Sequence, residues 1–489
     1  MVASRRARLL LGGAEAPHTG HGPGHSRCAD PPLVAGRIGV TEATRGGIVR
    51  QRCVLVLPST GEFDSRAYRI ASTLAARGHD VTMLARWASG LPTDERHPSG
   101  YRILRVPVSA VDGLPRPIRG IVQRLRPRRD GGGRSQTLDP TGVAGGTAGP
   151  GRVPGLARLH RFAGSVRRLA AIALTVRSQR RRTEAVAPAS DLVHAMAYMG
   201  IPIGLALGRR DRAAVIYDAR DIYVDAANLA RLPRPARALF GRFERRWARQ
   251  ASRVVTVNEP YARVMAERFE VAIPLIVLNC SYRQTDSGRP RHFHEALGID
   301  DAAQVVLYHG GLSRDRGIEH LIAALPALPA STHLVLMGYG VLEAGLVTRS
   351  ADPEMGGRLH VLPAVPPTEL LEWVGSADVV AMPIQPSTLN HRLTTPNKLF
   401  EAMASGVPVV ASDLPGMAGI VRQTGCGLLV DPVDPAAIAR AIATILELPP
   451  AEREAMGRRG RDAHLATYNW EAQAEVLLAE YGRLTRRPW

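Results

Sequence analysis

Lysine is almost absent from this chain of 489 residues: Lys398 is the only one, and the other 62 basic side chains are arginines. Arginine, alanine, glycine and proline are abundant, as in proteins of GC-rich genomes, so a single arginine carries little information. A single lysine carries more. It lies in "LTTPNKLFEAMASGVPVVASDLPG" (393–416), three residues before Glu401.

Cysteines and long apolar runs are also scarce. No C-x-x-C pair occurs, so neither a zinc knuckle nor a disulfide framework is indicated. No stretch approaches the ~20 apolar residues of a membrane span, and the basic start of the chain has an apolar run of only three leucines, whereas a secretory signal needs ~7–15. We therefore expect a cytoplasmic protein. The four cysteines are Cys28, Cys53, Cys280 and Cys426.

Aromatic residues make up only 5% of the chain, but apolar residues reach 45%, which suffices for a core. The length predicts two domains of ~100–200 residues each plus extra segments. The net charge of +19 is concentrated, because residues 116–184 hold sixteen arginines against three acids, a net charge of +13. No aromatic-interleaved platform accompanies this charge, so we expect no nucleic-acid partner.

Short apolar strands alternate with helices along most of the chain. Residues 1–50 lack hydrophobic periodicity and are expected to be disordered. Residues 51–285 form a first series, interrupted by the basic, partly disordered insertion 116–184, and residues 286–465 form a second. The pattern predicts an α/β protein with two facing Rossmann-like domains, whose ligands bind beyond the carboxyl ends of the strands.

Lys398 and Glu401 are predicted to share one face of a short helix, since they are three residues apart. Thr394 or Thr395 is a candidate cap, and Pro396 suits the first turn. A helix N-terminus with an ammonium group suits a diphosphate, and a carboxylate one turn on can accept two ribose hydroxyls. The alternative is an ordinary surface ion pair.

Other polar and glycine-rich loops follow the predicted strands. In "YHGGLSRDRG", Gly310 and Gly311 allow close backbone approach, and Arg316 or Arg314 can reach an anion; the alternative is a solvated loop. The loops with Gly338, Gly340 and Val365 can line a nucleobase. In the first domain the candidates are Gly61, Asp64, Arg66, His194 and Arg220, although a lone strand histidine is often a core residue.

The end of the basic insertion is predicted to be an amphipathic helix. Apolar residues recur at helical spacing from Leu156 to Val176, and arginines fall opposite them. Such a helix in residues 152–182 is typical of a membrane surface, which predicts peripheral attachment at the inner face of the plasma membrane. The alternative is a helix packed on the protein with its arginines in water.

The stretches "GGLSRDRGIEHLI" and "PNKLFEAMASGVPVVASDLPG" resemble the GT-B glycosyltransferases of the large retaining family 4. "YDARDIYVD", "RVVTVNE" and "VLNC" are similar to a subgroup that builds cell-envelope polysaccharides. The resemblance covers about residues 50–486. It implies that residues 466–489 form a last helix that returns to the first domain.

The resemblance implies that a nucleoside-diphosphate sugar binds the second domain and a glycan or lipid-linked acceptor binds the first. The ribose would be held by Glu401 and the diphosphate by Lys398, Arg316 and the helix N-terminus. Further donor contacts are expected from Gly310, Gly311, Arg314, Gly338, Gly340, Val365, Asn390, Asn397 and Leu399. The acceptor side would include Gly61, Asp64, Arg66 and Arg220. The catalytic candidates are Arg316, Lys398 and His194.

Three departures from the family pattern concern the donor. Gly311 stands where the family often has an arginine, Arg316 replaces the usual lysine, and Leu393 replaces an acid that touches the sugar, leaving Asn390 and His391 as the nearest polar residues. No D-x-D motif is present, so neither a metal nor another cofactor is expected. Fixed cations would stabilise the leaving diphosphate.

Two other interpretations remain. A nucleotide-sugar epimerase or hydrolase on the same fold would want a carboxylate near the sugar, and residues 379–400 contain none. The other alternative is a catalytically degenerate paralogue that binds nucleotide sugar, or a membrane-docked assembly partner.

Overall fold

The computed structural model of the chain describes residues 50–62, 64–114, 154–284 and 288–489. They form two compact units, each built on one sheet. The N-terminal unit contains the described residues up to Leu278, the short segment Thr388–Asn390, and Ala474–Trp489. The C-terminal unit contains Asn279–Ser387 and His391–Gln473.

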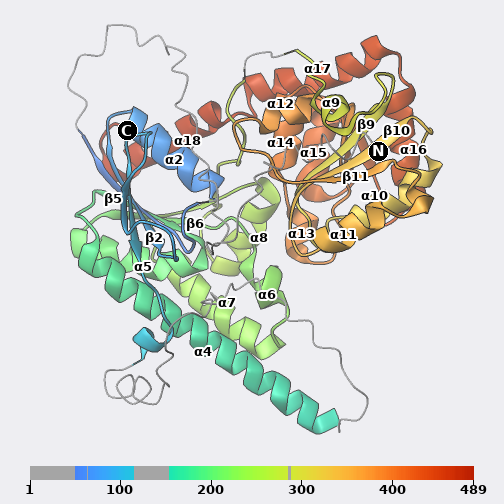
Figure 1. The fold of residues 1–489 in the computed structure, drawn as a ribbon. Helices are drawn as coiled ribbons and strands as arrows, with labels where there is room; N and C mark the ends of the chain where they lie inside the picture. The colour runs from blue at the N-terminus through green and yellow to red at the C-terminus, as the bar shows by residue number, and fades with distance from the viewer. Residues whose placement is uncertain (1–49, 63, 115–153, 285–287) are drawn as a thin grey trace, which may run out of the picture. The chain divides into compact units, whose positions relative to one another are not determined.

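The sheet of the N-terminal unit has the strand order β3-β4-β2-β1-β5-β6-β7-β8, and all its pairs are parallel except β3 with β4. The strands inside it are apolar and buried on both faces, as expected when helices cover both sides of a parallel sheet (Figure 1). The strands are β1 (Arg52–Val56), β2 (Asp80–Arg86), β3 (Asp94–Arg96), β4 (Arg102–Val106), β5 (Leu192–Met196), β6 (Ala214–Asp218), β7 (Arg253–Thr256) and β8 (Leu275–Ile276).

Helices connect these strands, and one of them comes from the far end of the sequence. Asp64 caps α2 by accepting a hydrogen bond from the N–H of Ala67, and Asn258 caps α8 in the same way. The helices are α2 (Ser65–Ala76), α4 (Pro154–Val186), α5 (Ala197–Asp211), α6 (Ala227–Ala230), α7 (Arg234–Ala248), α8 (Glu259–Phe269) and α18 (Trp470–Thr485), of which residues 474–485 belong to this unit.

The sheet of the C-terminal unit is entirely parallel, with the order β11-β10-β9-β12-β13-β14. Its strands are β9 (Gln304–Gly311), β10 (Thr332–Tyr339), β11 (Leu359–Leu362), β12 (Val379–Met382), β13 (Val409–Ser412) and β14 (Gly427–Val430). Its helices are α9 (His292–Leu297), α10 (Ile318–Ala324), α11 (Glu343–Ser350), α12 (Leu370–Gly375), α14 (Asn397–Ala404), α15 (Pro415–Thr424), α16 (Pro435–Glu447) and α17 (Pro450–Ala466), and α13 (Leu389–Leu393) lies where the chain passes between the units.

Two parallel sheets with helical crossovers confirm the prediction of an α/β protein with two Rossmann-like domains. The last helix also returns to the first domain as predicted, because Tyr481 of α18 bonds to His194 of β5. Strand β4 was not predicted, because the two arginines in its sequence "RILRV" interrupt the apolar run. The predicted disorder of residues 1–50 and of the centre of the insertion lies outside the described residues.

A helix is present where an amphipathic helix was predicted, namely α4, which runs from Pro154 to Val186. The side chains of its first ten residues lie outside the described set. Towards its end the helix packs on the domain: Ser178, Gln179 and Thr183 are buried, and the Gln179 amide donates to the carbonyl of Leu57. No helix among the described residues has an apolar stretch long enough to cross a bilayer.

Candidate functional site

The carboxyl ends of β9 and β10 approach each other so closely that only glycine fits. The ladder continues into the loops, pairing Gly338 with Gly310 and Tyr339 with Gly311. A Cβ on Gly338 would lie 1.9 Å from the carbonyl oxygen of Gly310, and one on Gly340 would lie 2.3 Å from that of Leu312. Two exposed backbone segments are therefore held together at the mouth of the C-terminal sheet.

Lys398 lies in the first turn of α14 and points to this mouth. Its Nζ sits 3.6 Å from the centre of the Tyr308 ring, a cation–π contact. The Tyr308 hydroxyl donates to the carbonyl of Gly311 at 2.9 Å, so one buried ring supports both the lysine and the glycine loop. A Cβ on Gly310 would be 3.8 Å from Nζ. The backbone of the loop and the ammonium group thus border the same space.

The surroundings of Lys398 disfavour the charged form of its side chain. Burial lowers its pKa, the nearby charge of Arg316 lowers it further, and Glu401 opposes them, which leaves the pKa at about 7. Arg316 is half-buried and Arg314 is exposed, and neither has an ion pair within the described part of the chain. Two cations that repel each other beside a glycine loop are suited to an anionic ligand with several charges.

Glu401 lies one helical turn after Lys398, with its side chain 14% exposed. Its Oε2 is 3.6 Å from Nδ1 of His309, the residue between Tyr308 and Gly310. Burial lowers the pKa of His309 to about 3, helped by the charge of Lys398, so this imidazole is neutral near pH 7. Its Nε2 has no hydrogen-bond partner among the described residues.

The N-terminus of α14 is arranged differently from the prediction. Pro396 is the residue at the cap position, and no side chain bonds to the free N–H groups there. Thr395 instead donates to the carbonyl of Gly416, and neither it nor Thr394 is the cap. The first N–H groups of α14 therefore remain without a capping side chain, which keeps this helix end suited to an anion.

Of the other predicted donor residues, Asn390 and Leu399 form hydrogen bonds within the protein. The amide of Asn390 accepts from the N–H of Ile222 at 2.8 Å and donates to Asp221 at 3.0 Å, within the N-terminal unit. Leu399 is fully buried in the core, and its N–H donates to the carbonyl of Pro396. Both amide atoms of Asn390 have partners, which disagrees with the prediction that this residue contacts the donor. The contact of Leu399 with the donor stays a prediction.

Asn397 and Val365 keep positions compatible with the prediction. Asn397 begins α14 next to Lys398, and its side-chain oxygen accepts from the amide of Asn279 at 3.0 Å. Val365 is half-buried in the loop after β11. Of the remaining predicted donor residues, the four glycines lie at the mouth of the sheet, and Arg316 is close enough to lower the pKa of Lys398. Arg314 lies in the same loop, and its contact with the donor stays a prediction.

Two of the residues predicted in the first domain, Arg66 and His194, lie in a buried network. Arg66 donates to Asp218 at 2.6 Å and to the carbonyl of Val277, and His194 lies 3.0 Å from the same Asp218 oxygen. The other nitrogen of His194 bonds to Tyr481 at 2.7 Å. Both side chains are fully buried, so the prediction that they contact an acceptor disagrees with their position.

The charge of this network is balanced internally. Burial alone would raise the pKa of Asp218, but Arg66 and His194 outweigh it and hold that pKa below its usual range. Close by in sequence, Arg220 pairs with Asp64 at 2.6 Å. Gly61 has φ +88° in the loop before α2, which requires glycine. Gly61 and Asp64 are buried, so Arg220 is the predicted acceptor-side residue that stays partly accessible.

Tyr308 and His309 are functional candidates that the sequence did not reveal. The strand "VVLYHGG" shows only that both precede the glycine pair. Lys398 meets the ring of Tyr308 and Glu401 meets the imidazole of His309, so both strand residues border α14. No cluster of three or more histidine, cysteine or acidic side chains in the described ranges could hold a metal.

Comparison with known proteins gives matches for the C-terminal unit and for the whole fold. Residues 303–448 match the family Glycosyl transferases group 1. The chain is 33% identical over 192 residues to a D-inositol 3-phosphate glycosyltransferase of Segniliparus rotundus, a match that covers 38% of this chain and 41% of that protein. The chain thus spans less than half the length of this relative.

Solved structures resemble the chain over most of its length. Sucrose-phosphate synthase from Thermosynechococcus elongatus superposes with a TM-score of 0.63 at 21% identity, over 89% of this chain and all of that one. Anabaena HepE, in complex with UDP and glucose, gives a TM-score of 0.59 at 16% identity, again over 89% and 100%. At these identities the likeness concerns the fold.

Proposed function

We propose that this chain, which has the GT-B fold and a group 1 glycosyl transferase domain at residues 303–448, transfers a sugar from a nucleoside-diphosphate donor to an acceptor. The observation that carries the proposal is the arrangement around Tyr308: Lys398, Glu401 and the Gly310 loop meet at the mouth of one sheet. That site offers positive charge for a diphosphate and, one turn away, a carboxylate for ribose hydroxyls. The Anabaena protein of the same fold, solved with UDP and glucose, supports this class of donor.

The proposed chemistry depends on charge at the leaving group. Cleavage of the sugar–diphosphate bond builds negative charge on the diphosphate, and preorganised cations and N–H groups stabilise that charge. Lys398, Arg316 and the uncapped N-terminus of α14 supply them here. With retention of configuration, the leaving phosphate itself can accept the proton of the acceptor. This is consistent with His194 being buried and already bonded on both nitrogens.

For the acceptor we propose a glycan or lipid-linked molecule of envelope polysaccharide synthesis, on the strength of the motifs "YDARDIYVD" and "RVVTVNE". The relative named D-inositol 3-phosphate glycosyltransferase supports a second acceptor class, a phosphorylated polyol. Arg220 and the loop of Gly61 are the residues we assign to the acceptor. The attachment of residues 152–182 to a membrane surface also stays a proposal.

The test is a binding and turnover screen on the full chain. UDP-, GDP- and dTDP-sugars are titrated into the wild type and into Lys398→Ala, and release of nucleoside diphosphate is then followed with glycan, lipid-linked and inositol-phosphate acceptors. We expect one nucleotide to bind, Lys398→Ala to weaken it, and one acceptor to stimulate release. Binding of no nucleotide sugar would refute the proposal.

A second candidate is a protein that binds nucleotide sugar without transferring it. This alternative is favoured by two residues that lack a charge found in the family pattern. Gly311 stands where the family often has an arginine, and Leu393 stands where it has an acid. Tight donor binding without release of nucleoside diphosphate, across the same acceptors, would support it over transfer.

A further inference from the structure

Helix α7 presents an outward face that combines exposed apolar and basic side chains. Its inner face, with Ala236, Phe240, Glu244 and Ala248, is buried against the domain. On the outer face Leu239 is 50% exposed and Phe243 is 49% exposed. Large apolar side chains exposed one turn apart are unusual enough in a soluble domain to require an explanation.

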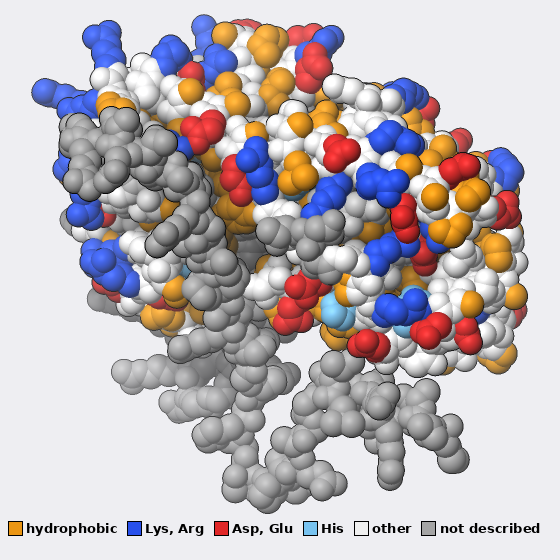
Figure 2. All heavy atoms as spheres, turned by 90° about the horizontal axis from the view of Figure 1, so that it is seen from above, with side chains coloured by type: hydrophobic (Ala, Val, Ile, Leu, Met, Phe, Trp, Pro, Cys, Tyr) orange, Lys and Arg blue, Asp and Glu red, His pale blue; other side chains and the backbone are white. Residues whose placement is uncertain are grey.

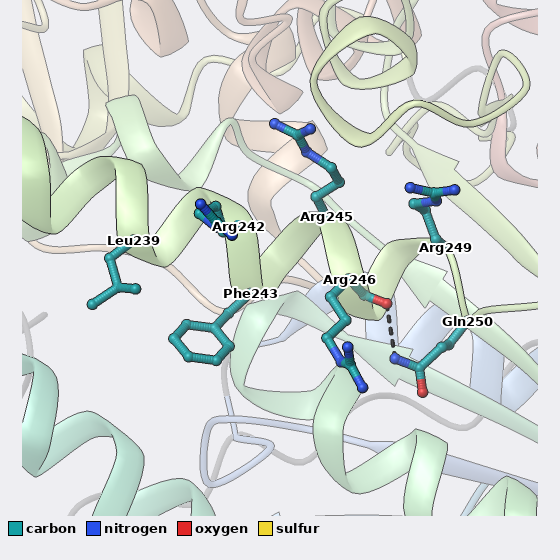
Figure 3. A pocket seen from close by; sticks show the side chains of 7 residues that line it. All are labelled: Leu239, Arg242, Phe243, Arg245, Arg246, Arg249 and Gln250. Atoms are coloured by element: carbon teal, nitrogen blue, oxygen red, sulfur yellow. Dashed lines mark hydrogen bonds between the residues drawn. The ribbon is translucent and has the colours of Figure 1, made fainter.

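Arginines surround these two apolar side chains. A shallow groove is lined by Leu239, Arg242, Phe243, Arg245, Arg246, Arg249 and Gln250, and Figure 3 shows the arginines extending from both sides of the helix around Phe243. Phe243 also stacks on Trp247, with ring centres 6.1 Å apart. We call this outward face, from Leu239 to Gln250, the α7 face.

Little negative charge compensates the α7 face. Glu270 pairs with Arg245 and Arg249, but Arg242 and Arg246 have no ion pair with any described residue. Helix α4, which contacts α7, adds further exposed arginines at positions such as Arg177. On the face that Figure 2 shows, acidic and basic side chains are interspersed. The excess of positive charge on the α7 face therefore favours an anionic partner.

Two occupants from the chain itself are disfavoured by charge. Residues 1–49 and 115–153 both contain more arginines than acids, so neither complements the α7 face. A second copy that used the same face would bring arginines against arginines. A partner with both negative charge and an apolar layer fits better, because phosphates can meet the guanidinium groups while Leu239 and Phe243 enter the apolar region.

We propose that the α7 face docks the protein on an anionic lipid bilayer, with Leu239 and Phe243 inserted at the boundary between headgroups and acyl chains. The residues that carry this proposal lie on α7, next to α4, and Ser178 and Gln179 of α4 are buried against the domain. The inference goes beyond the proposed function, since it holds whether or not the chain transfers sugar.

The test measures binding of the purified full chain to vesicles of phosphatidylcholine alone and of phosphatidylcholine mixed with phosphatidylglycerol, by flotation. We expect binding to the anionic vesicles only, weakened by added salt. Leu239→Ser/Phe243→Ser and Arg242→Glu/Arg246→Glu should each lower the partition coefficient at least about tenfold. Because all four side chains are on the surface, thermal unfolding should be unchanged.

Matched controls are exposed residues of other helices. Val347→Ser in α11, where the valine is 51% exposed, and Arg458→Glu in α17 should leave vesicle binding intact. The proposal is overturned if the wild type ignores anionic vesicles, if it binds neutral ones equally well, or if both α7 double variants bind like the wild type. It is also overturned if the wild type is a dimer, Leu239→Ser/Phe243→Ser is a monomer, and this variant still binds vesicles. A second copy of the chain would then be what covers the α7 face.

Discussion

Donor affinity should depend on the protonation of Lys398, and this dependence can be worked out from the structure. The perturbation is pH, together with the substitutions Lys398→Arg and Lys398→Ala. In the free protein burial and Arg316 lower the pKa of Lys398 to about 7, from the model-peptide value of 10.5. A bound diphosphate favours the ammonium form and raises that pKa again, so binding takes up a proton above pH 7.

The magnitude follows from this linkage. Below about pH 7 the ammonium is already present and affinity is full, whereas at about pH 8.5 most free protein must first protonate Lys398. Each unit of pH above the pKa costs about 1.4 kcal/mol, so the affinity for nucleoside diphosphate should fall by about tenfold between about pH 7 and pH 8.5. Lys398→Ala should weaken the binding free energy of nucleoside diphosphate by about 1.5–3 kcal/mol near neutral pH, the range of a charge-assisted hydrogen bond.

The assay is isothermal titration of nucleoside diphosphate in two buffers of different ionisation enthalpy, which gives both the affinity and the protons taken up. The second ionisation of phosphate groups lies near pH ~6, so the ligand itself contributes little in this window. Lys398→Arg is the matched control, because a guanidinium stays charged and should bind with nearly constant affinity.

Two results would refute this reasoning. Affinity of the wild type that is constant between pH 7 and 8.5, without proton uptake, would mean that Lys398 is charged in the free protein or does not meet the ligand. The same pH dependence in Lys398→Arg would assign the proton to another group.

Three further substitutions separate the parts of the site and of the fold. Tyr308→Leu should weaken nucleotide binding by about 0.5–2 kcal/mol, because it removes the ring under the ammonium. Tyr308→Phe keeps the ring and should bind nearly as well, and the loss of its hydroxyl should lower the free energy of unfolding by about 1 kcal/mol. Equal affinities for the two variants would exclude the cation–π role. Gly338→Ala, whose Cβ would lie 1.9 Å from a carbonyl oxygen, should lower the free energy of unfolding by about 1–3 kcal/mol in urea, while Gly345→Ala, with nothing within 4 Å, should not destabilise the protein. Asp218→Asn should lower the free energy of unfolding by about 3–5 kcal/mol, because it leaves the buried Arg66 without its ion-pair partner. A melting temperature like that of the wild type would show that the network contributes little to stability.

The sequence was most informative where function depends on neighbours along the chain. A lysine and a glutamate three residues apart in a helix must share a face, and both do lie at the mouth of the C-terminal sheet. The alternation of short apolar strands with helices likewise predicted both sheets. These inferences rest on local periodicity, which the sequence displays directly.

Prediction failed where a side chain finds its partner far along the chain. Arg66 lies 152 residues from Asp218, and His194 lies 287 residues from Tyr481. Each of the four residues is polar and lies near a strand end or helix, so each suggests an exposed site until its partner is known. The same holds for Asn390, whose amide is occupied by the loop at Asp221. Burial by a distant partner has no signature in the local sequence.

The composition of the N-terminal unit has a consequence for biosynthesis. Its core includes Tyr481, which the ribosome adds only after it has made all of the C-terminal unit. Until then the nascent first domain exposes the site on β5 where that tyrosine belongs, and the buried His194 lacks one of its two bonds. The second domain can therefore complete its fold before the first, an inversion of the usual vectorial order in which the domain emerging earlier from the ribosome matures earlier.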